Sequence, residues 1–432
     1  MSKIKRLSAY LLSAALVVTL TGQAGSAQAI TECSAAAQIA SPHLGYLYAY
    51  AVDVESGKVL INEKGTQATP SASVLKVLTV AAALENIPEN YTATTRVFTV
   101  PGQPGTIVLK GGGDHTLSQV SRDGYTTYVR APQLSTLASR VYARWTSESQ
   151  ITKIILDDSF FSGPTYNSAW KASDRTNGYI SHITGLQLDG DRANPDLTST
   201  HYSGYRSTNP VLKTGEKFRE QLAGLAVGAQ LVVGKTPKNA VELTSISSQP
   251  IETWMDHAIT VSDNTETEFI ARHAAIAAGL KPTFASIEPM VKTLLADLKI
   301  DSRKLVMKDG SGLAQADRVT PKMITQLMRA VALGDPELAP LESYLPVAGV
   351  SGGLAGRFTG RNAAARGSVK GKTGFIPGLY SLAGIIDAKD GSRIAYAIFA
   401  RSHVSKKVDG QTRNAIDTLA SRFYFCGANL TE

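Results

Sequence analysis

The two ends of the chain carry the clearest alternation of apolar and polar positions. Residues 44–62 form two apolar runs on either side of Glu55-Ser56-Gly57, a pattern typical of a β-hairpin. Residues 378–387 and 393–401 are two further apolar runs joined by a short polar turn, which predicts a second hairpin, and a terminal helix is expected around residues 413–423. We expect both hairpins to lie in one antiparallel sheet, with the middle of the chain inserted between them.

Helical periodicity dominates the segments beside these hairpins. Residues 74–84 are almost continuously apolar after a Thr-Pro-Ser start signal, which predicts a helix that is buried nearly all round. From about residue 251 the helical pattern returns, with candidate helices at residues 269–278, 287–298 and 323–333. We assign these helices to the same domain as the two hairpins.

The middle of the chain, from about residue 95 to residue 250, differs in composition, because it is rich in Gly, Ser and Thr. It contains short strand-like runs and two amphipathic patterns, which predict strands at residues 106–109, 151–156 and 230–233 and helices at residues 134–145 and 218–225. We therefore predict a mixed α/β fold of the α+β type. Residues 30–95 and 251–432 form one domain with an antiparallel sheet and helices, and residues 96–250 form an inserted α+β module.

The first thirty residues resemble a targeting segment rather than part of the fold. Three basic residues precede an apolar run at residues 7–20, and Ala27-Gln28-Ala29 supplies the small residues of a cleavage site. We predict a secretory signal peptide over residues 1–29 and an extracytoplasmic location, in the cell wall or a periplasm-like space. An uncleaved membrane anchor is the alternative. Loss of three basic residues lowers the net charge from +8 to +5, which suits peripheral contact with an anionic wall or membrane surface.

The two cysteines, Cys33 and Cys426, lie near opposite ends of the exported chain. Export permits a disulfide, and the termini of a domain are often close in space, so we favour one bridge between them. Two free, partly buried thiols are the alternative. The seven histidines include no His-Glu-x-x-His motif and no pairing with cysteine at metal-ligand spacing, so we expect no metal site.

Three short motifs carry candidate chemistry. They are Ser73-Val74-Leu75-Lys76, Ser262-Asp263-Asn264 and Lys372-Thr373-Gly374, and this ordered trio is the signature of penicillin-binding proteins and class A β-lactamases. Ser73, at the start of a helix, is the candidate nucleophile. Lys76 lies one turn further on the same helical face, and burial would lower its pKa so that it can accept the Ser73 proton.

The other motif residues have complementary candidate roles. Ser262 can relay a proton to a leaving amine, and Asn264 can orient Lys76 and bind a substrate amide. The remaining candidates would hold a substrate carboxylate or supply the oxyanion hole with the Ser73 N–H; they are Lys372, Thr373, Gly374 and the backbone N–H of Phe375.

A second set of matching triplets occurs in the same order. It consists of Ser168-Ala169-Trp170-Lys171, Ser207-Thr208-Asn209 and Lys213-Thr214-Gly215. However, Ser168 opens no apolar helix, and too few residues separate the second and third triplets to hold intervening helices. We therefore favour the first set as the catalytic one and expect the second set to form surface loops.

Flanking segments extend the match beyond the three motifs. Residues 109–117 resemble a Gly-Gly-Asp-Pro-Thr-Leu segment, residues 309–313 read Asp-Gly-Ser-Gly-Leu, and residues 345–357 contain Leu-Pro-Val-Ala-Gly. With these blocks the sequence resembles the class C low-molecular-mass penicillin-binding proteins, the serine D-Ala-D-Ala carboxypeptidase/endopeptidase family. The resemblance implies a penicillin-binding domain of the serine β-lactamase type, with an insert between the first two motifs.

Two departures from the family pattern and one further candidate affect substrate recognition. Residues 186–210 look abbreviated, which leaves open whether an accessory domain is missing. Phe375 stands where the family commonly has Thr, so a hydroxyl near the substrate carboxylate is lost. Asp157, after the strand expected at residues 151–156, is a candidate reader of a substrate amine, and a solvated turn is its alternative interpretation.

These patterns point to a secreted serine DD-peptidase that acts on peptidoglycan stem peptides. It would cleave a D-Ala-D-Ala bond, a D-amino-acid cross-link, or both, through an acyl-enzyme on Ser73 and with no metal or organic cofactor, and β-lactam antibiotics would acylate the same serine. A serine β-lactamase is the first alternative, although no Glu-x-x-Leu-Asn segment lies between the first two motifs. A non-hydrolytic wall-binding scaffold is the second. Nucleic acid is not an expected partner, because no dense Lys/Arg run with interleaved aromatics occurs.

Overall fold

The structure is a computed structural model that describes residues 33–120, 126–147, 149–195, 204–403 and 408–432. The expected signal peptide, residues 1–29, lies outside the described residues. Within the described ranges, every helix falls short of the length and apolar character needed to cross a membrane.

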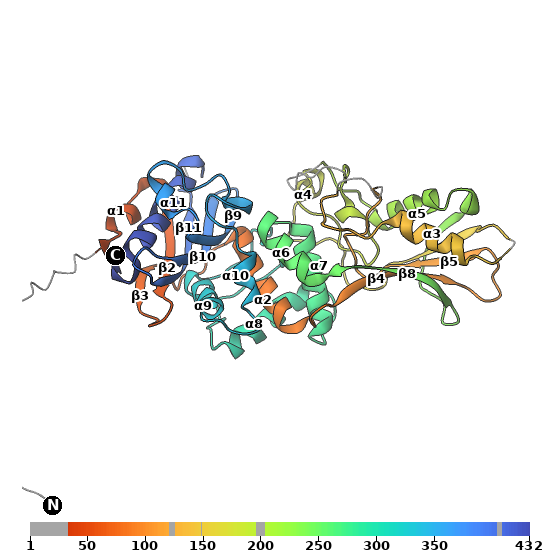
Figure 1. The fold of residues 1–432 in the computed structure, drawn as a ribbon, viewed down its shortest axis with the longest axis horizontal. Helices are drawn as coiled ribbons and strands as arrows, with labels where there is room; N and C mark the ends of the chain where they lie inside the picture. Colours follow the sequence, from red (N-terminus) through yellow and green to blue (C-terminus); the bar gives the residue numbers. More distant parts are fainter. Residues whose placement is uncertain (1–32, 121–125, 148, 196–203, 404–407) are drawn as a thin grey trace, which may run out of the picture. The chain divides into compact units, whose positions relative to one another are not determined.

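The first and last parts of the described chain share one five-stranded antiparallel sheet (Figure 1). Its strands, in spatial order, are β3 (Val59–Glu63), β2 (Tyr46–Asp53), β11 (Arg393–Arg401), β10 (Leu379–Asp387) and β9 (Val369–Ile376). Both predicted hairpins are therefore present, and β2 of the first pairs with β11 of the second. In this sheet β9, which carries the third motif, forms an edge.

Helices cover both faces of this sheet. Along β11, Ala395, Ala397 and Phe399 face one core, whereas Ile394 and Tyr396 face the other, as the period-two geometry of a strand requires. The first core is shared with α2 (Lys76–Asn86), α6 (Ile251–Val261), α7 (Asn264–Ala277), α8 (Ile287–Asp297), α9 (Pro321–Ala332) and α10 (Pro340–Tyr344). The second core is closed by α11 (Gly410–Cys426). Helix α2 is buried over its first eight residues, as predicted for a helix surrounded by other elements.

Residues between α2 and α6 form a second five-stranded sheet. Its order is β7 (Gln230–Val233), β6 (Lys153–Asp157), β5 (Thr106–Lys110), β4 (Thr92–Thr99) and β8 (Val241–Pro250). The strands β5, β6 and β7 run parallel, which the sequence analysis did not predict. The crossover helices α3 (Leu134–Arg144) and α5 (Pro210–Gln221) pack together over a third hydrophobic core. Helix α5 begins at Pro210, well before the expected start at residue 218.

The paired strands β4 and β8 connect this second sheet to α2 and α6 (Figure 1). Neither strand was predicted, because several inward positions carry hydroxyl or small side chains, such as Ala93 and Thr95 on β4 and Ser248 on β8. Apolar alternation was therefore weak. Strand β4 starts at Thr92, so it crosses the boundary expected at residue 96.

The remaining helices are short. Helices α1 (Ala36–Ile39) and α4 (Ala172–Thr176) have no fully buried residue, and several 3₁₀ turns connect the longer elements.

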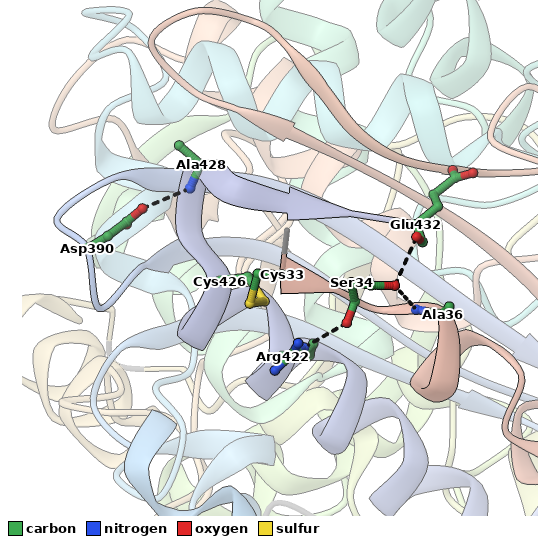
Figure 2. Close-up of a disulfide and its surroundings, with 8 residues drawn as sticks. All are labelled: Cys33, Ser34, Ala36, Asp390, Arg422, Cys426, Ala428 and Glu432. Atoms are coloured by element: carbon green, nitrogen blue, oxygen red, sulfur yellow. Dashed lines mark hydrogen bonds between the residues drawn. A yellow bond between two sulfur atoms is a disulfide. The ribbon is translucent and has the colours of Figure 1, made fainter. Parts of the chain in front are cut away.

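Both ends of the described chain are tied together by a disulfide between Cys33 and Cys426 (Figure 2). Next to it, β1 (Cys33–Ser34) pairs in parallel with β12 (Leu430–Thr431). Arg422 Nε donates to the Ser34 carbonyl oxygen at 2.9 Å, and Ser34 Oγ donates to the Glu432 carbonyl oxygen at 3.0 Å. These contacts hold the first described strand against the last one.

Reduction of this disulfide should lower the melting temperature and leave the catalytic chemistry intact. The bridge joins residues separated by 393 positions and so restricts the unfolded chain, and disulfides typically contribute about 2–4 kcal/mol to the free energy of unfolding. The measurement is thermal unfolding with and without reductant, and the Cys33→Ser/Cys426→Ser variant shows whether the reductant acts through this bridge. Two thiols that titrate in the unreduced, denatured protein would contradict the bridge.

Candidate active site

The candidate nucleophile lies on a 3₁₀ turn that leads directly into α2. This turn spans Ala72–Leu75, and Ser73 is its half-buried member, whereas the neighbouring apolar side chains point into the core. Ser381 Oγ, on β10, donates to the Ser71 carbonyl oxygen at 2.7 Å. The sheet therefore fixes the turn immediately before Ser73.

Lys76 connects the first motif to the second. Its Nζ lies 3.1 Å from Ser73 Oγ and donates to Asn264 Oδ1 at 2.6 Å and to the Ser311 carbonyl oxygen at 2.7 Å. The side chain is fully buried, and burial lowers the pKa of Lys76 to about 8, although the carboxylates of Asp309 and Glu268 oppose this shift. An amine with this pKa can be neutral near physiological pH, as a general base must be.

The second motif is placed by the junction of two helices. Helix α6 ends at Val261, the next residue, Ser262, has left-handed backbone angles (φ 65°, ψ 36°), and α7 begins at Asn264. Asp263 caps α7, because its Oδ1 accepts the Glu266 N–H at 3.0 Å. Asn264 Nδ2 donates to the Tyr179 carbonyl oxygen at 3.0 Å, so the amide that contacts Lys76 is held from both sides.

Lys372 connects the third motif to the second. From β9 its Nζ donates to Ser262 Oγ at 2.9 Å and to the Thr373 carbonyl oxygen at 3.0 Å. Burial, together with the positive charge of Lys76, lowers the pKa of Lys372 well below its usual value. A substrate carboxylate bound beside Lys372 would favour its charged form and raise that pKa again.

Gly374 lets β9 approach the nucleophile closely. A methyl group at this position would lie 2.3 Å from Ser381 Oγ, 2.7 Å from the Ser71 carbonyl oxygen and 3.0 Å from the Ser73 nitrogen. No side chain fits into this space without moving the strand or the turn.

Replacing Gly374 with alanine should therefore slow acylation of Ser73 by roughly tenfold or more, because displacement of reacting groups by about 1 Å is costly. Gly224→Ala is the matched control, since a methyl group there meets nothing within 4 Å. The rate of penicillin acylation, measured alongside the melting temperature, separates the two variants. Native acylation by Gly374→Ala would show that this close approach is unnecessary.

The Asp-Gly-Ser-Gly-Leu segment at residues 309–313 supplies the carbonyl oxygen that accepts a hydrogen bond from Lys76, and Glu268 holds this segment in place. Glu268 on α7 accepts the N–H groups of Gly310 and Ser311 at 2.9 and 2.8 Å. Asp309 accepts the Gly312 N–H at 2.7 Å. Burial and the charge of Asp309 raise the pKa of Glu268 to about 8. Sequence reasoning missed Glu268, because α7 carries several other polar and charged residues and nothing in the local sequence distinguishes this one.

Two cavities, of about 410 and 390 Å³, share Ser73, Ser262 and Phe375 in their walls. Phe375 is 55% exposed, and its ring packs 4.7 Å from that of Tyr380. The first cavity is lined further by Thr373, Gly374, Tyr380, Arg357 and Arg413, and the second by Lys171, Asp174, Asn177, Tyr179, Asn264 and Leu313. A substrate chain therefore has room on both sides of the serine. Sequence reasoning assigned no role to Arg357, Arg413 or Tyr179.

Asp157 does not join these residues. It ends β6 in the second sheet, where its carboxylate accepts Ser159 Oγ at 2.6 Å and Thr236 Oγ1 at 2.5 Å, together with both backbone N–H groups. Although burial raises the pKa of Asp157, these hydrogen bonds lower it overall. Because the carboxylate is occupied and 1% exposed, the structure supports neither the expected amine contact nor a solvated turn.

The second set of triplets does not assemble into a site, but the expectation that it forms surface loops is wrong in part. Ser168 is exposed in a turn. In contrast, residues 213–215 lie within α5, where Thr214 and Gly215 are buried. The sequence pattern predicted this helix only from residue 218, whereas α5 begins at Pro210 and therefore includes the third triplet.

In the described ranges no group of three or more His, Cys, Asp or Glu side chains is placed to bind a metal ion.

The antiparallel sheet, the buried Ser-x-x-Lys helix and the lysine on β9 are the arrangement of a penicillin-recognising serine enzyme. The profile of the D-Ala-D-Ala carboxypeptidase 3 (S13) family matches residues 32–208 and 196–423. Carboxypeptidase DacB of Mycolicibacterium smegmatis is 33% identical over 395 residues, which cover 91% of this chain and 83% of the relative. A carboxypeptidase of Mycobacterium tuberculosis is 30% identical over 416 residues, 95% and 87% of the two chains. The chain therefore belongs to the S13 family of D-Ala-D-Ala carboxypeptidases, which confirms the family predicted from the motifs.

The solved structures agree with this assignment at the level of the fold. Penicillin-binding protein 4 of Haemophilus influenzae superposes with a TM-score of 0.72 at 19% identity, over 88% of this chain and 96% of that chain. The same protein has also been solved in complex with a β-lactam, at a TM-score of 0.65 and 17% identity, over 88% of this chain and 96% of that chain. The predicted fold class is confirmed.

Proposed function

We propose that this enzyme is an exported DD-peptidase that hydrolyses the terminal D-Ala-D-Ala bond of peptidoglycan stem peptides through an acyl-enzyme on Ser73. The observation that carries the proposal is the convergence of the three motifs. Lys76 Nζ contacts both Ser73 Oγ and Asn264 Oδ1, and Lys372 Nζ contacts Ser262 Oγ. Family membership and the two cavities around Ser73 support the same substrate class.

The first half of the reaction transfers the peptide to the enzyme. Lys76, as the neutral amine, takes the Ser73 proton while Oγ attacks the carbonyl carbon of the penultimate D-Ala. The N–H groups of Ser73 and Phe375 stabilise the tetrahedral oxyanion. The C–N bond then breaks, and Ser262 relays to the leaving nitrogen the proton that Lys76 took from Ser73, while Lys372 stays charged. Free D-Ala leaves, and the peptide remains as an ester on Ser73.

The second half returns the enzyme to its starting state. A water molecule attacks the ester carbonyl and gives one proton to Lys76, which is again the neutral amine. The ester bond breaks, Ser73 Oγ takes that proton from Lys76, and the shortened peptide releases its remaining proton to solvent and leaves as a carboxylate. Because a β-lactam presents a strained amide to the same nucleophile, we propose that it forms an equivalent ester and blocks the enzyme.

The surroundings of the site extend the proposal to substrate recognition and location. Lys372 and Thr373 would bind the terminal carboxylate of the substrate, and Phe375 presents an aromatic ring there in place of a hydroxyl. We further propose that residues 1–29 direct export and that residues 96–250 act as an accessory domain. Peptidoglycan lies outside the cytoplasmic membrane, so export would bring the enzyme to its substrate.

Digestion of purified peptidoglycan followed by mass analysis tests this function. Loss of terminal D-Ala from pentapeptide stems indicates the carboxypeptidase, and conversion of dimers to monomers indicates endopeptidase activity on cross-links. Ser73→Ala protein is the control. Sustained hydrolysis of penicillin without any change in the peptidoglycan would favour the β-lactamase alternative, and a native enzyme inactive in both assays would favour a wall-binding scaffold.

A further inference from the structure

An unusual turn in the inserted segment lies beside the second motif. Asp189, Gly190 and Asp191 have consecutive positive φ values of 50°, 55° and 57°. Residues with a Cβ atom rarely adopt this left-handed region, and such outliers concentrate at functional sites. The next residue along the chain is Arg192.

The flanking contacts hold Asp189 and Gly190 in this conformation. Asp189 Oδ2 accepts the backbone and side-chain N–H groups of Gln119 at 3.1 and 3.0 Å. The backbone N–H groups of Asp189 and Gly190 donate to the carbonyl oxygens of Leu117 and His115 at 2.9 and 2.7 Å. The segment at residues 109–117, which resembles the family's Gly-Gly-Asp block, thus holds one side of the turn through backbone hydrogen bonds.

Asp191 is held from the opposite side by the second set of triplets. Its carboxylate accepts the Ser207 N–H at 2.6 Å, the Ser207 hydroxyl at 2.9 Å and Lys213 Nζ at 3.0 Å. Asp191 is 1% exposed, so these contacts are made in a buried setting. Two of the apparent motif residues, Ser207 and Lys213, therefore stabilise the turn.

The turn directs Arg192 onto the central residue of the second motif. Arg192 Nη2 donates to Asp263 Oδ2 at 2.6 Å, and both side chains are almost completely buried. Asp263 separates Ser262 from Asn264, and its other carboxylate oxygen caps α7. Although burial raises the pKa of Asp263, the positive charge of Arg192 lowers it far below its usual value, so the carboxylate is ionised.

We propose that Arg192 is a positioning residue for the peptidase reaction, which acts through Asp263 to fix the side chains of Ser262 and Asn264. Through this ion pair the inserted segment completes the active site that the other domain carries. A buried carboxylate without its partner is strongly unfavourable, so loss of Arg192 would displace Asp263 and the two residues beside it. This inference rests on the proposed acyl-enzyme on Ser73.

The test is the kinetics of penicillin acylation, resolved into the dissociation constant of the initial complex and the acylation rate constant. Arg192→Met should lower the rate constant by roughly ten- to a hundredfold, as expected when catalytic groups shift by about 1 Å, with a smaller change in the dissociation constant. Arg96→Met is the matched control, because Arg96 is 44% exposed on β4 and pairs with Glu242. It should acylate as the native protein does.

The same substitution in an Asp263→Asn background distinguishes positioning from a general loss of stability. Asparagine can still cap α7 but carries no charge that needs Arg192. If Arg192 acts through Asp263, Arg192→Met should change the acylation rate constant little in this background, and the two substitutions should be strongly non-additive. The two Asp263→Asn proteins, with and without Arg192→Met, can be compared even if Arg192→Met alone does not fold, and a large loss between them would then overturn the proposal.

Equal losses from Arg192→Met in both backgrounds, or a native rate in Arg192→Met alone, would overturn the proposal. Failure of the native protein to form any ester on Ser73 would instead overturn the proposed function, so the two failures are distinguishable.

Discussion

Ser73→Ala protein should release no D-Ala from a peptide ending in D-Ala-D-Ala and should bind no penicillin covalently. The substitution removes the atom that forms the ester, and loss of the nucleophile in a serine hydrolase costs on the order of a millionfold in rate. The fold should persist, because Ser73 is half-buried on the cavity side of its turn and the adjacent Ala72, Val74 and Leu75 make the core contacts. D-Ala release, mass spectrometry of the intact protein and thermal unfolding together check this expectation.

The second set of triplets offers a control of the same chemical type. Ser168 also precedes a lysine by three positions, but it is an exposed turn residue. Ser168→Ala should therefore hydrolyse peptide and bind penicillin like the native protein. Labelling that persists in Ser73→Ala and disappears in Ser168→Ala would reverse the assignment.

The two buried lysines should respond differently to the same substitution. Lys76→Arg should lose nearly all acylation, since a guanidinium stays protonated at any usable pH and cannot accept the Ser73 proton. Lys372→Arg keeps a positive charge beside the substrate carboxylate and should retain measurable acylation, reduced by the larger head group. The rate of penicillin acylation compares them, and equal rates for the two variants would show that this division of roles is wrong.

The pH dependence of the native enzyme tests the same division. Burial lowers the pKa of Lys76 to about 8, so the neutral base is the minor form below that pH and the acylation rate should rise as pH increases through about 8. The acylation rate constant at saturating penicillin is the one to measure, because it reports the complex, in which the bound carboxylate favours the charged form of Lys372 and the rise with pH reports Lys76. A rate that falls steadily from pH 6 to 9 would be inconsistent with Lys76 as the base.

Elements with strong hydrophobic periodicity were predictable from the sequence. Both terminal hairpins and the helices α2, α8 and α9 follow their apolar patterns closely, because each buries a continuous apolar face or stripe. In contrast, the pairing of β5 with β6 and of β6 with β7 depends on how distant segments meet. No local pattern distinguishes a parallel strand of five residues from an antiparallel one.

Site residues that belong to short sequence motifs were predictable. Site residues that act through tertiary contacts were not. The motif residues Ser73, Lys76 and Lys372 could be selected from spacing and context. Glu268 and Arg192 could not, because each acts through a buried contact with a segment remote in sequence, Gly310 and Ser311 in one case and Asp263 in the other. Asp157 shows the same limit, since its position after a strand suggested recognition, whereas the folded structure surrounds its carboxylate with hydrogen bonds from Ser159 and Thr236.

The most direct test of the account is to locate the acyl group in native protein that has been incubated with penicillin. Peptide mapping by tandem mass spectrometry after digestion should place one penicilloyl group on the fragment that contains Ser73, and fragmentation should assign it to that side chain. An adduct on any other residue, or no adduct in a protein that hydrolyses D-Ala-D-Ala peptide, would contradict Ser73 as the nucleophile.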